Sequence, residues 1–260
     1  MNPAEFANIA RSEQKLWWYR GMNAILLALI DKYVAEKPGR VLEAGSGTGY
    51  LASLVQSRLG WTVDALDLGW QGLQYARRLG IARLVQGDIA ALPFPTAYFD
   101  AVLSMDVIVH LERGEERRAF VELSRVLREG GLALIRVSAL DVLHSRHSTF
   151  AGERQRFTRE RLMEEAGAAG LEVLRCTYAN SLLVPVALAK FRVWEPLTKA
   201  PAASGVSPVA PWLDRLLYLP LQAEAALIGA GFNFPLGQSL FLVGRKRASG
   251  ASGSNRERTL

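Results

Sequence analysis

The chain has 260 residues, of which 50% are hydrophobic and 22% are charged, and this is enough for one large domain with a substantial appendage. A single cysteine, Cys176, excludes a disulfide framework and a cysteine-based metal site, and it agrees with a reducing cytoplasm. The net charge of +6 does not indicate nucleic-acid binding, because four of those charges belong to residues 245–260, where five Arg or Lys side chains stand against one acid.

The N-terminal stretch 1–38 predicts a helical cap. Residues 12–36, "SEQKLWWYRGMNAILLALIDKYVAE", read as one or two helices with an aromatic cluster. The chain does not begin with a basic start and an apolar core followed by a cleavage site, so we expect no signal peptide. No apolar run reaches the roughly 18 residues of a membrane span. We therefore expect cytoplasmic localisation.

Residues 39–180 predict the core of the protein. Short apolar runs alternate there with amphipathic stretches, which indicates a parallel sheet with helices on both faces. Expected helices lie near 48–59, 70–79 and 114–129, and a further helix begins at a Thr158 cap. Expected strands lie near 40–44, 62–67, 83–87, 99–105, 132–138 and 171–178, with a last strand near 238–245.

Residues 181–237 predict a helical insertion between the last two strands. They are rich in Leu, Val, Pro and aromatics, and they read as two or three helices joined by the linker "TKAPAASGVSP". The insertion is a candidate lid or partner surface. Residues 238–247 return to the core, and the Gly/Ser-rich residues 248–260 predict a disordered tail.

The stretch Val41 to Tyr50, "VLEAGSGTGY", places three glycines at every second position after a strand. Glycines at such a turn let the backbone approach a ligand, and the following helix offers free N–H groups. A phosphate-binding P-loop requires Lys and Ser or Thr after its last glycine, so Tyr50 and Leu51 exclude that class. A dinucleotide loop requires Gly or Ala at position 50, so the tyrosine weakens that class.

An acid two residues before glycines at 45, 47 and 49 resembles motif I of the class I S-adenosylmethionine-dependent methyltransferases, with Glu43 for the usual Asp. Later positions agree in order: "TVDALD" ends in Asp67, 22 residues after Gly45, "VQGDIAALPF" contains Asp88, and "FDAVLSMDVIVHL" follows. The resemblance covers about 40–140 closely and extends to about 175; the type 11 group, which includes quinone-ring methyltransferases, is the most similar. It implies an α/β fold: a Rossmann-like seven-stranded sheet with helices on both faces, an N-terminal helical cap and a helical insertion before the last strand.

The resemblance also implies S-adenosyl-L-methionine as cofactor. In that family the acid at Glu43 lies near the ammonium end of the methionine moiety, the acid at Asp67 accepts the ribose hydroxyls, and the acid at Asp88 binds the adenine amino group. An N-terminal helix closes over the cofactor in similar enzymes, which implies contacts from Tyr19 or Arg20. The complete set of expected cofactor contacts is Tyr19, Arg20, Glu43, Ala44, Gly45, Ser46, Gly47, Asp67, Leu68, Gly87, Asp88, Ile89, Met105 and Asp106.

Two histidines are the candidate catalytic residues. His110 follows the fourth strand, and a neutral imidazole can accept a proton from a hydroxyl near pH 7. His147, with His144, follows the fifth strand at the edge where open α/β sheets bind ligands. Packing is the alternative role of His110, and a solvated loop is the alternative for the other two. Cys176 is expected to be buried and inert, and we find no metal-site spacing of His, Cys, Asp and Glu.

These observations favour a methyltransferase that acts on a small, hydrophobic or natural-product-like acceptor, with O-, N- or C-methylation open. A cyclase or isomerase that binds the same cofactor is the first alternative. A protein, peptide or nucleic-acid methyltransferase ranks lower, because the core has no "NPPY"-type loop and no basic patch interleaved with aromatics, and a dinucleotide-dependent oxidoreductase ranks last. We expect a small-molecule substrate and no nucleic-acid partner. Contact with a membrane surface ranks low, because the sequence has no basic amphipathic face. A homodimer remains an open alternative.

Overall fold

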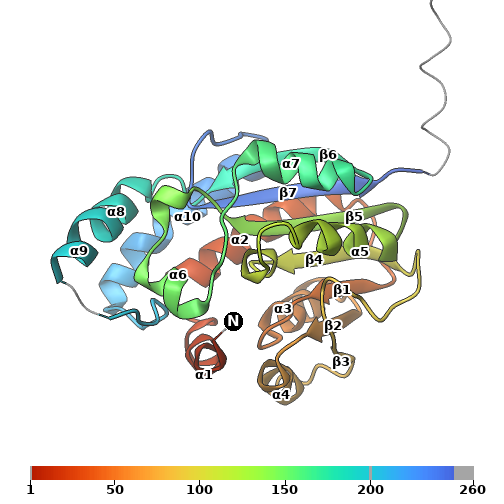
Figure 1. The fold of residues 1–260 in the computed structure, drawn as a ribbon, viewed down its shortest axis with the longest axis horizontal. Helices are drawn as coiled ribbons and strands as arrows, with labels where there is room; N and C mark the ends of the chain where they lie inside the picture. Colours follow the sequence, from red (N-terminus) through yellow and green to blue (C-terminus); the bar gives the residue numbers. More distant parts are fainter. Residues whose placement is uncertain (1, 199–200, 249–260) are drawn as a thin grey trace, which may run out of the picture.

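The computed structural model describes residues 2–198 and 201–248. Seven strands of this part form one sheet in the order β3-β2-β1-β4-β5-β7-β6 (Figure 1), which confirms the predicted fold class. The strands are β1 (Val41–Ala44), β2 (Val63–Asp67), β3 (Leu84–Gln86), β4 (Phe99–Met105), β5 (Leu127–Ser138), β6 (Leu171–Ala179) and β7 (Ser239–Lys246).

The direction of the strands creates a site at one edge of the sheet. Strands β1 to β5 are parallel, and β7 runs antiparallel between β5 and β6. Since β1 lies between β2 and β4, the strand order reverses beside β1. The carboxyl ends of these strands meet there, and open α/β sheets bind ligands at such a reversal.

Helices cover the sheet on both sides. Figure 1 shows α5 and α7 in front of the sheet and α2 behind it. The predicted Thr158 cap of α7 is confirmed, since its side chain accepts a hydrogen bond from the Arg161 backbone N–H at 3.3 Å. The helices are α1 (Pro3–Ser12), α2 (Trp17–Tyr33), α3 (Tyr50–Leu59), α4 (Trp70–Arg78), η1 (Ile108–His110), α5 (Glu116–Val126), η2 (Asp141–Leu143), α6 (Arg146–Ala151), α7 (Arg159–Ala168), α8 (Val184–Leu188), η3 (Ala189–Trp194), α9 (Glu195–Thr198) and α10 (Pro211–Ala230).

The boundary between α5 and β5 differs from the prediction. The helix was expected to reach residue 129, but it ends at Val126 and the strand begins at once. Leu127 pairs with Phe99, and the register then shifts so that Leu132 pairs with Ala101. Gly130, at a φ of +75°, lies in this bulge. Gly130 and Gly131, which follow the predicted end of the helix, therefore lie within a bent strand.

The N-terminal cap and the insertion pack against each other. The predicted cap contains α1 and α2, and the insertion contains the consecutive segments α8, η3 and α9, followed by α10. Helix α10 lies along α2, and a Cβ on Gly21 would overlap the Leu221 side chain. Gly21 therefore allows the close approach of the two helices.

Some expectations lie outside the described residues. The tail predicted for 248–260 falls on undescribed residues from 249 onward. Within the described ranges no helix combines the length and the apolar character needed to cross a bilayer. Cys176 is buried, and burial raises the pKa of its thiol to about 11, which agrees with the predicted inert role.

Candidate cofactor and acceptor site

The glycine loop leaves the end of β1 with three left-handed residues. Gly45, Gly47 and Gly49 have φ angles of +86°, +54° and +78°, which side chains other than glycine rarely adopt. A Cβ on Gly45 would overlap Val107, and one on Gly49 would overlap the Cβ of Ala76. A Cβ on Gly47 would meet no atom within 4 Å. Packing therefore requires the outer two glycines, whereas Gly47 faces open space that a ligand can enter.

Asp67 joins this loop to the end of β2. Its Oδ2 accepts the backbone N–H of Gly47 at 2.7 Å, and its Oδ1 accepts the backbone N–H of Gly69 at 2.7 Å. The next residue, Leu68, is 69% exposed. The carboxylate thus holds the glycine loop in place, and an uncovered apolar side chain lies beside it.

Buried acids gather around the same loop. Glu43, at 4% exposure, and Glu13, which follows α1, come from different elements. Glu13 accepts a hydrogen bond from the hydroxyl of Thr48 in the loop. Burial raises the pKa of Glu13 to about 7 and the pKa of Glu43 well above its usual range, and the charges of Asp67 and Glu13 raise that of Glu43 further. A positively charged ligand would relieve this repulsion.

Three buried polar atoms near the loop and the end of β4 have no hydrogen-bond partner in the described structure: Glu43 Oε2, Ser46 Oγ and Asp106 Oδ1. Such orphaned atoms are uncommon and costly in folded proteins. Asp106 also has a φ of +57°, directly after β4. The atoms fit a ligand that carries both a cation and hydrogen-bond donors, which is the chemistry of the methionine moiety of S-adenosylmethionine.

The adenine side of the predicted site is only partly preformed. Gly87 donates its backbone N–H to Asp67 O at 3.1 Å, which brings the ends of β3 and β2 together. Asp88 is exposed, and its Oδ1 accepts the Ala90 backbone N–H at 2.9 Å, so it caps a turn. Ile89 beside it is buried. The adenine contact of Asp88 stays a prediction.

A second polar pair lies where β4 and β5 end. Arg136 on β5 is buried and donates to Asp106 Oδ2 through Nε at 3.0 Å and through Nη2 at 2.6 Å. Its guanidinium stands 4.9 Å from the centre of the Trp18 ring. Trp18 in turn meets the Tyr19 ring edge-on at 5.0 Å. Burial and nearby acids raise the pKa of Tyr19, so its hydroxyl stays protonated.

Arg20, the other expected cofactor contact of this segment, lies against the insertion. Its guanidinium pairs with Asp214 on α10 and stands 4.2 Å from the centre of the Tyr218 ring. Asp214 Oδ1 also accepts the Trp17 backbone N–H at 2.7 Å. Arg20 therefore ties α2 to α10, and its contact with a cofactor stays a prediction.

His110 is held by one ring nitrogen. Nδ1 lies 3.0 Å from the carbonyl oxygen of Gly152, the residue after α6. Because a carbonyl only accepts, Nδ1 carries the proton and Nε2 is left as an acceptor. Burial lowers the pKa of the imidazole. His110 is therefore a neutral side chain that is able to accept a proton.

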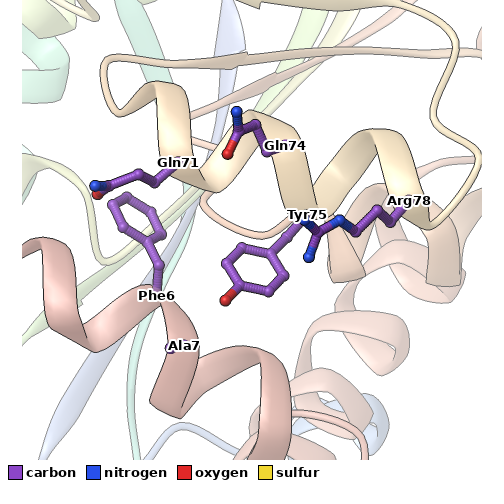
Figure 2. A pocket seen from close by; sticks show the side chains of 6 residues that line it. All are labelled: Phe6, Ala7, Gln71, Gln74, Tyr75 and Arg78. Atoms are coloured by element: carbon purple, nitrogen blue, oxygen red, sulfur yellow. The ribbon is translucent and has the colours of Figure 1, made fainter.

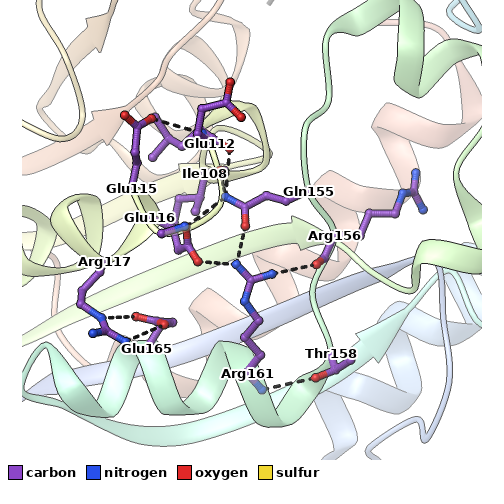
Figure 3. A network of polar contacts seen from close by, with 12 residues as sticks. Ile108, Glu112, Glu115, Glu116, Arg117, Gln155, Arg156, Thr158, Arg161 and Glu165 are labelled. Carbon is purple, nitrogen blue, oxygen red and sulfur yellow. Dashed lines mark hydrogen bonds and ion pairs between the residues drawn. The ribbon is translucent and has the colours of Figure 1, made fainter.

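A polar network fixes the loop that carries His110 (Figure 3). Arg161 on α7 binds the side chains of Glu116 and Gln155 and donates to Arg156 O at 3.2 Å. Gln155 Nε2 donates to Leu111 O at 3.0 Å. The network connects α5, α7 and the segment after α6, so the His110 loop is held from two sides.

His147 lies farther out, on α6. Its Nδ1 accepts the backbone N–H of Gly205 at 3.0 Å and stands 3.6 Å from Glu5 Oε1. Glu5 Oε1 also accepts the hydroxyl of Ser204 at 2.8 Å. His147 thus joins α1, α6 and the linker of the insertion, while His144 is exposed. A catalytic role for His147 stays a prediction.

The N-terminal segment screens the loop. The Phe6 ring packs at Gly69 and Gly72, where a Cβ on either glycine would lie 2.7 Å from it. A hollow of about 260 Å³ remains between α1 and α4, and Figure 2 shows Phe6 and Tyr75 facing into it. Phe6 therefore packs on the start of α4, and Glu13 contacts Thr48 of the loop.

Sequence reasoning missed Glu13, Thr48 and Arg136. A charged residue inside the apolar strand "LALIRVS" was a signal for Arg136, because a buried arginine needs a partner. Glu13 stands in a polar stretch, "RSEQK", and gave no signal.

Comparisons with known proteins show what the core of the chain is similar to. The methyltransferase domain family matches residues 42–135. The chain is 35% identical over 163 residues to a malonyl-[acyl-carrier protein] O-methyltransferase of Enterobacter lignolyticus, with 62% of this chain and 64% of that protein covered. It is 42% identical over 99 residues to a fatty-acid O-methyltransferase of Mycolicibacterium smegmatis, covering 36% and 35%. The solved phosphoethanolamine N-methyltransferase 2 of Haemonchus contortus, in complex with S-adenosyl-L-methionine, superposes with a TM-score of 0.57 at 20% identity over 87% of this chain and 53% of that one.

The seven-stranded sheet, its reversal beside β1 and the acid-lined glycine loop define the methyltransferase fold. The match over residues 42–135 and the superposition on the phosphoethanolamine N-methyltransferase 2 show that the core of the chain has the fold of the class I S-adenosylmethionine-dependent methyltransferases. The solved Haemonchus contortus structure holds S-adenosyl-L-methionine, which is the cofactor that the sequence of this chain predicts. The chain spans less than two thirds of the length of both relatives, at 64% and 35%.

Proposed function

We propose that this chain transfers a methyl group from S-adenosylmethionine to a small, hydrophobic acceptor. The proposal rests on the hydrogen bond that Asp67 Oδ2 accepts from the Gly47 backbone N–H, which holds the glycine loop in place. Open space lies beside Gly47, and Glu43 Oε2 has no hydrogen-bond partner in the described structure. A preformed loop lowers the ordering cost of binding. Burial raises the pKa of Glu43 and of Glu13, and a bound cation would favour the ionised form of both carboxyl groups.

The cofactor, when bound, supplies an electrophilic methyl group on a sulfonium. The protein contributes alignment and the exclusion of water. Glu43 and Ser46 would hold the methionine end, Asp67 would bind the ribose while it keeps the loop closed, and Leu68 would cover one side of the base. Phe6 and the rest of α1 screen this edge from solvent.

Acceptor binding falls to the edge between β4, β5 and α2. Trp18 and Tyr19 offer aromatic surface there, and Arg136 holds Asp106 in a fixed orientation. His110 Nε2 would take a proton from an acceptor that must lose one. An acceptor that arrives already ionised needs no base, and His110 would then only position it.

Acyl compounds are the first acceptors to screen. The two relatives are named for a malonyl-acyl carrier and for a fatty acid, and this chain has an apolar insertion beside α2. This chain matches less than two thirds of the length of either relative, so the names of the relatives do not fix its acceptor. Aromatic and terpenoid acids and alcohols therefore belong in the same screen. The atom that is methylated follows from the product.

Calorimetric titration with S-adenosylmethionine, S-adenosylhomocysteine and NADH tests the cofactor step. We expect both adenosyl ligands to bind and NADH not to bind, and Asp67→Ala to weaken the adenosyl ligands about tenfold or more. Asp100→Ala is the matched control, because Asp100 Oδ2 also accepts two backbone N–H groups, from Gly39 at 2.6 Å and Arg40 at 2.8 Å, away from the site.

Mass spectrometry of acceptor reactions tests the transfer step. A product that gains one methyl group, together with S-adenosylhomocysteine, supports the proposal. A rearranged product of unchanged mass would instead identify a cyclase or isomerase that uses the bound cofactor only to shape its site. Equal loss of ligand binding in the Asp67 and Asp100 variants would show a general folding defect, and no adenosyl binding in the wild type would refute the proposal.

A further inference from the structure

Most of the large hydrophobic side chains that are exposed in the described part of the chain lie in the insertion. Of the sixteen large hydrophobic side chains exposed in the described residues, eleven lie between 181 and 237. They belong to α8, η3, α9, α10 and the segments beside them: Leu182, Val186, Val193, Trp194, Leu197, Trp212, Leu216, Leu219, Leu227, Phe232 and Leu236. We call this set the insertion face. Exposed apolar surface of this concentration marks an interaction site.

Helix α10 presents a continuous part of the insertion face. Trp212, Leu216 and Leu219 follow one another at intervals of four and three residues, so they form one stripe, and they are 67%, 55% and 60% exposed. The opposite side of α10 is buried, with Leu221 packed at Gly21 of α2. The stripe therefore points away from the protein core.

The segments α8 to α9 extend the insertion face at the same end of the molecule (Figure 1). Trp194 and Leu197 are 64% and 74% exposed. The buried Glu224 of α10 accepts the backbone N–H groups of Ser181 and Leu182, both at 2.8 Å, and so holds the start of this segment beside α10. Two exposed tryptophans and a set of leucines thus belong to neighbouring helices.

The exposed charge of the insertion is positive. Its acids are already engaged: Asp214 binds Arg20, Glu195 accepts the Arg146 backbone N–H at 2.9 Å, and Glu224 is buried. Lys190 and Arg215 are exposed, and neither makes an ion pair with a described residue. A partner for this face must therefore bring both apolar surface and negative charge.

We propose that the insertion face docks on an anionic lipid surface. Tryptophan and leucine side chains suit the boundary between headgroups and acyl chains, and Lys and Arg suit the lipid phosphates. A second copy of this chain is a less suitable partner for the insertion face. A two-fold dimer contact would place the insertion face against the same face of the other copy, and that face offers no free acid to Lys190 and Arg215. The protein would lie on the membrane surface, with the insertion face toward the lipid.

Tryptophan quenching by brominated phosphatidylglycerol in mixed vesicles tests the proposal on the full chain. We expect quenching and co-flotation with these vesicles, and weaker binding to phosphatidylcholine alone or in high salt. The double substitution Trp194→Phe/Trp212→Phe is expected to retain binding but to lose most of the quenching. Trp70→Phe is the matched control, since Trp70 is 58% exposed on α4, which lies well away from α8 and α9 in Figure 1.

Two further substitutions separate the contributions to docking. Trp212→Ser/Leu216→Ser is expected to lower the partition coefficient about tenfold or more, whereas Val121→Ser on α5, 49% exposed, leaves it unchanged. Lys190→Gln/Arg215→Gln is expected to remove the preference for anionic vesicles. In each variant the urea midpoint measures the stability of the fold, and the binding of S-adenosylhomocysteine tests the proposed cofactor site. A failure of the cofactor site is therefore distinguishable from a failure of docking.

Three results would overturn the proposal. The first is no flotation of a folded wild type with anionic vesicles. The second is a pair of results: the Arg256→Gln/Arg258→Gln variant no longer floats with the vesicles, whereas the insertion variants still do. The C-terminal cations would then explain the binding to lipid. The third is a lipid-free dimer, seen by light scattering, that Trp212→Ser dissociates.

Discussion

The hydroxyl of Thr48, in the glycine loop, donates a hydrogen bond to the carboxylate of Glu13, which follows the N-terminal helix α1. The contact joins two segments 35 residues apart. Both side chains are buried, at 3% and 5% exposure. The N-terminal segment is therefore attached to the cofactor loop through an acid that responds to pH.

Glu13 should make the stability of the protein pH-dependent. Its pKa is about 7 in the folded protein, against 4.5 for the ordinary side chain. The folded state therefore holds the proton more tightly, and this stabilisation is present below about pH 4.5 and is lost as the pH rises through about 7. Glu13→Gln should remove up to about 3 kcal/mol of this pH dependence, measured by urea unfolding at pH 5 and 8. Identical pH dependence in both proteins would contradict the buried position of the carboxylate.

Gly47→Ala should affect ligand binding more than stability. The new Cβ has no neighbour within 4 Å, so the fold loses only about 1 kcal/mol from the left-handed φ. The methyl group would project into the space proposed for the cofactor, and binding of S-adenosylhomocysteine should fall at least about tenfold. Gly80→Ala is the control, because Gly80 has a φ of +82° and an equally open Cβ position. Equal affinities in the two variants would move the ligand away from Gly47.

Asp214 should stabilise the start of α2. Its Oδ1 accepts the Trp17 backbone N–H at 2.7 Å, and its other oxygen binds Arg20. Asp214→Ala should lower the free energy of unfolding by about 1–2 kcal/mol, as the loss of a helix cap does. Asp214→Asn retains an acceptor for the cap and should cost less. Urea unfolding measures both, and an Ala variant as stable as the wild type would show that the cap makes no contribution.

His110 should titrate below the ordinary imidazole value. Burial lowers its pKa from 6.5, and the hydrogen bond to Gly152 opposes this only in part. Nuclear magnetic resonance of the three histidines, assigned through His110→Gln, His144→Gln and His147→Gln, measures each titration. We expect His110 to be neutral at pH 7 with its proton on Nδ1. A pKa above 6.5 would contradict the burial of the ring, and a proton on Nε2 would remove the acceptor atom that the proposed base requires.

Local patterns predicted the sheet. Each strand is a short apolar run. Glu43 and the glycines lie at the end of β1, and Asp67 lies at the end of the adjacent strand β2. Such features depend on neighbours in the chain, so periodicity and motif spacing reveal them. The placement of Leu127 was wrong because its strand pairing with Phe99 overrides the helical pattern before the glycines.

The residue pattern is enough to locate the strands, the glycine loop and the acids at strand ends. Which side chains meet depends on the folded chain: Arg136 and Asp106 are 30 positions apart, and Arg20 and Asp214 are 194 apart. A charged side chain signals that it needs a partner, but not which one. The partner depends on how distant elements pack, which is why Arg20, predicted beside a cofactor, lies against the insertion.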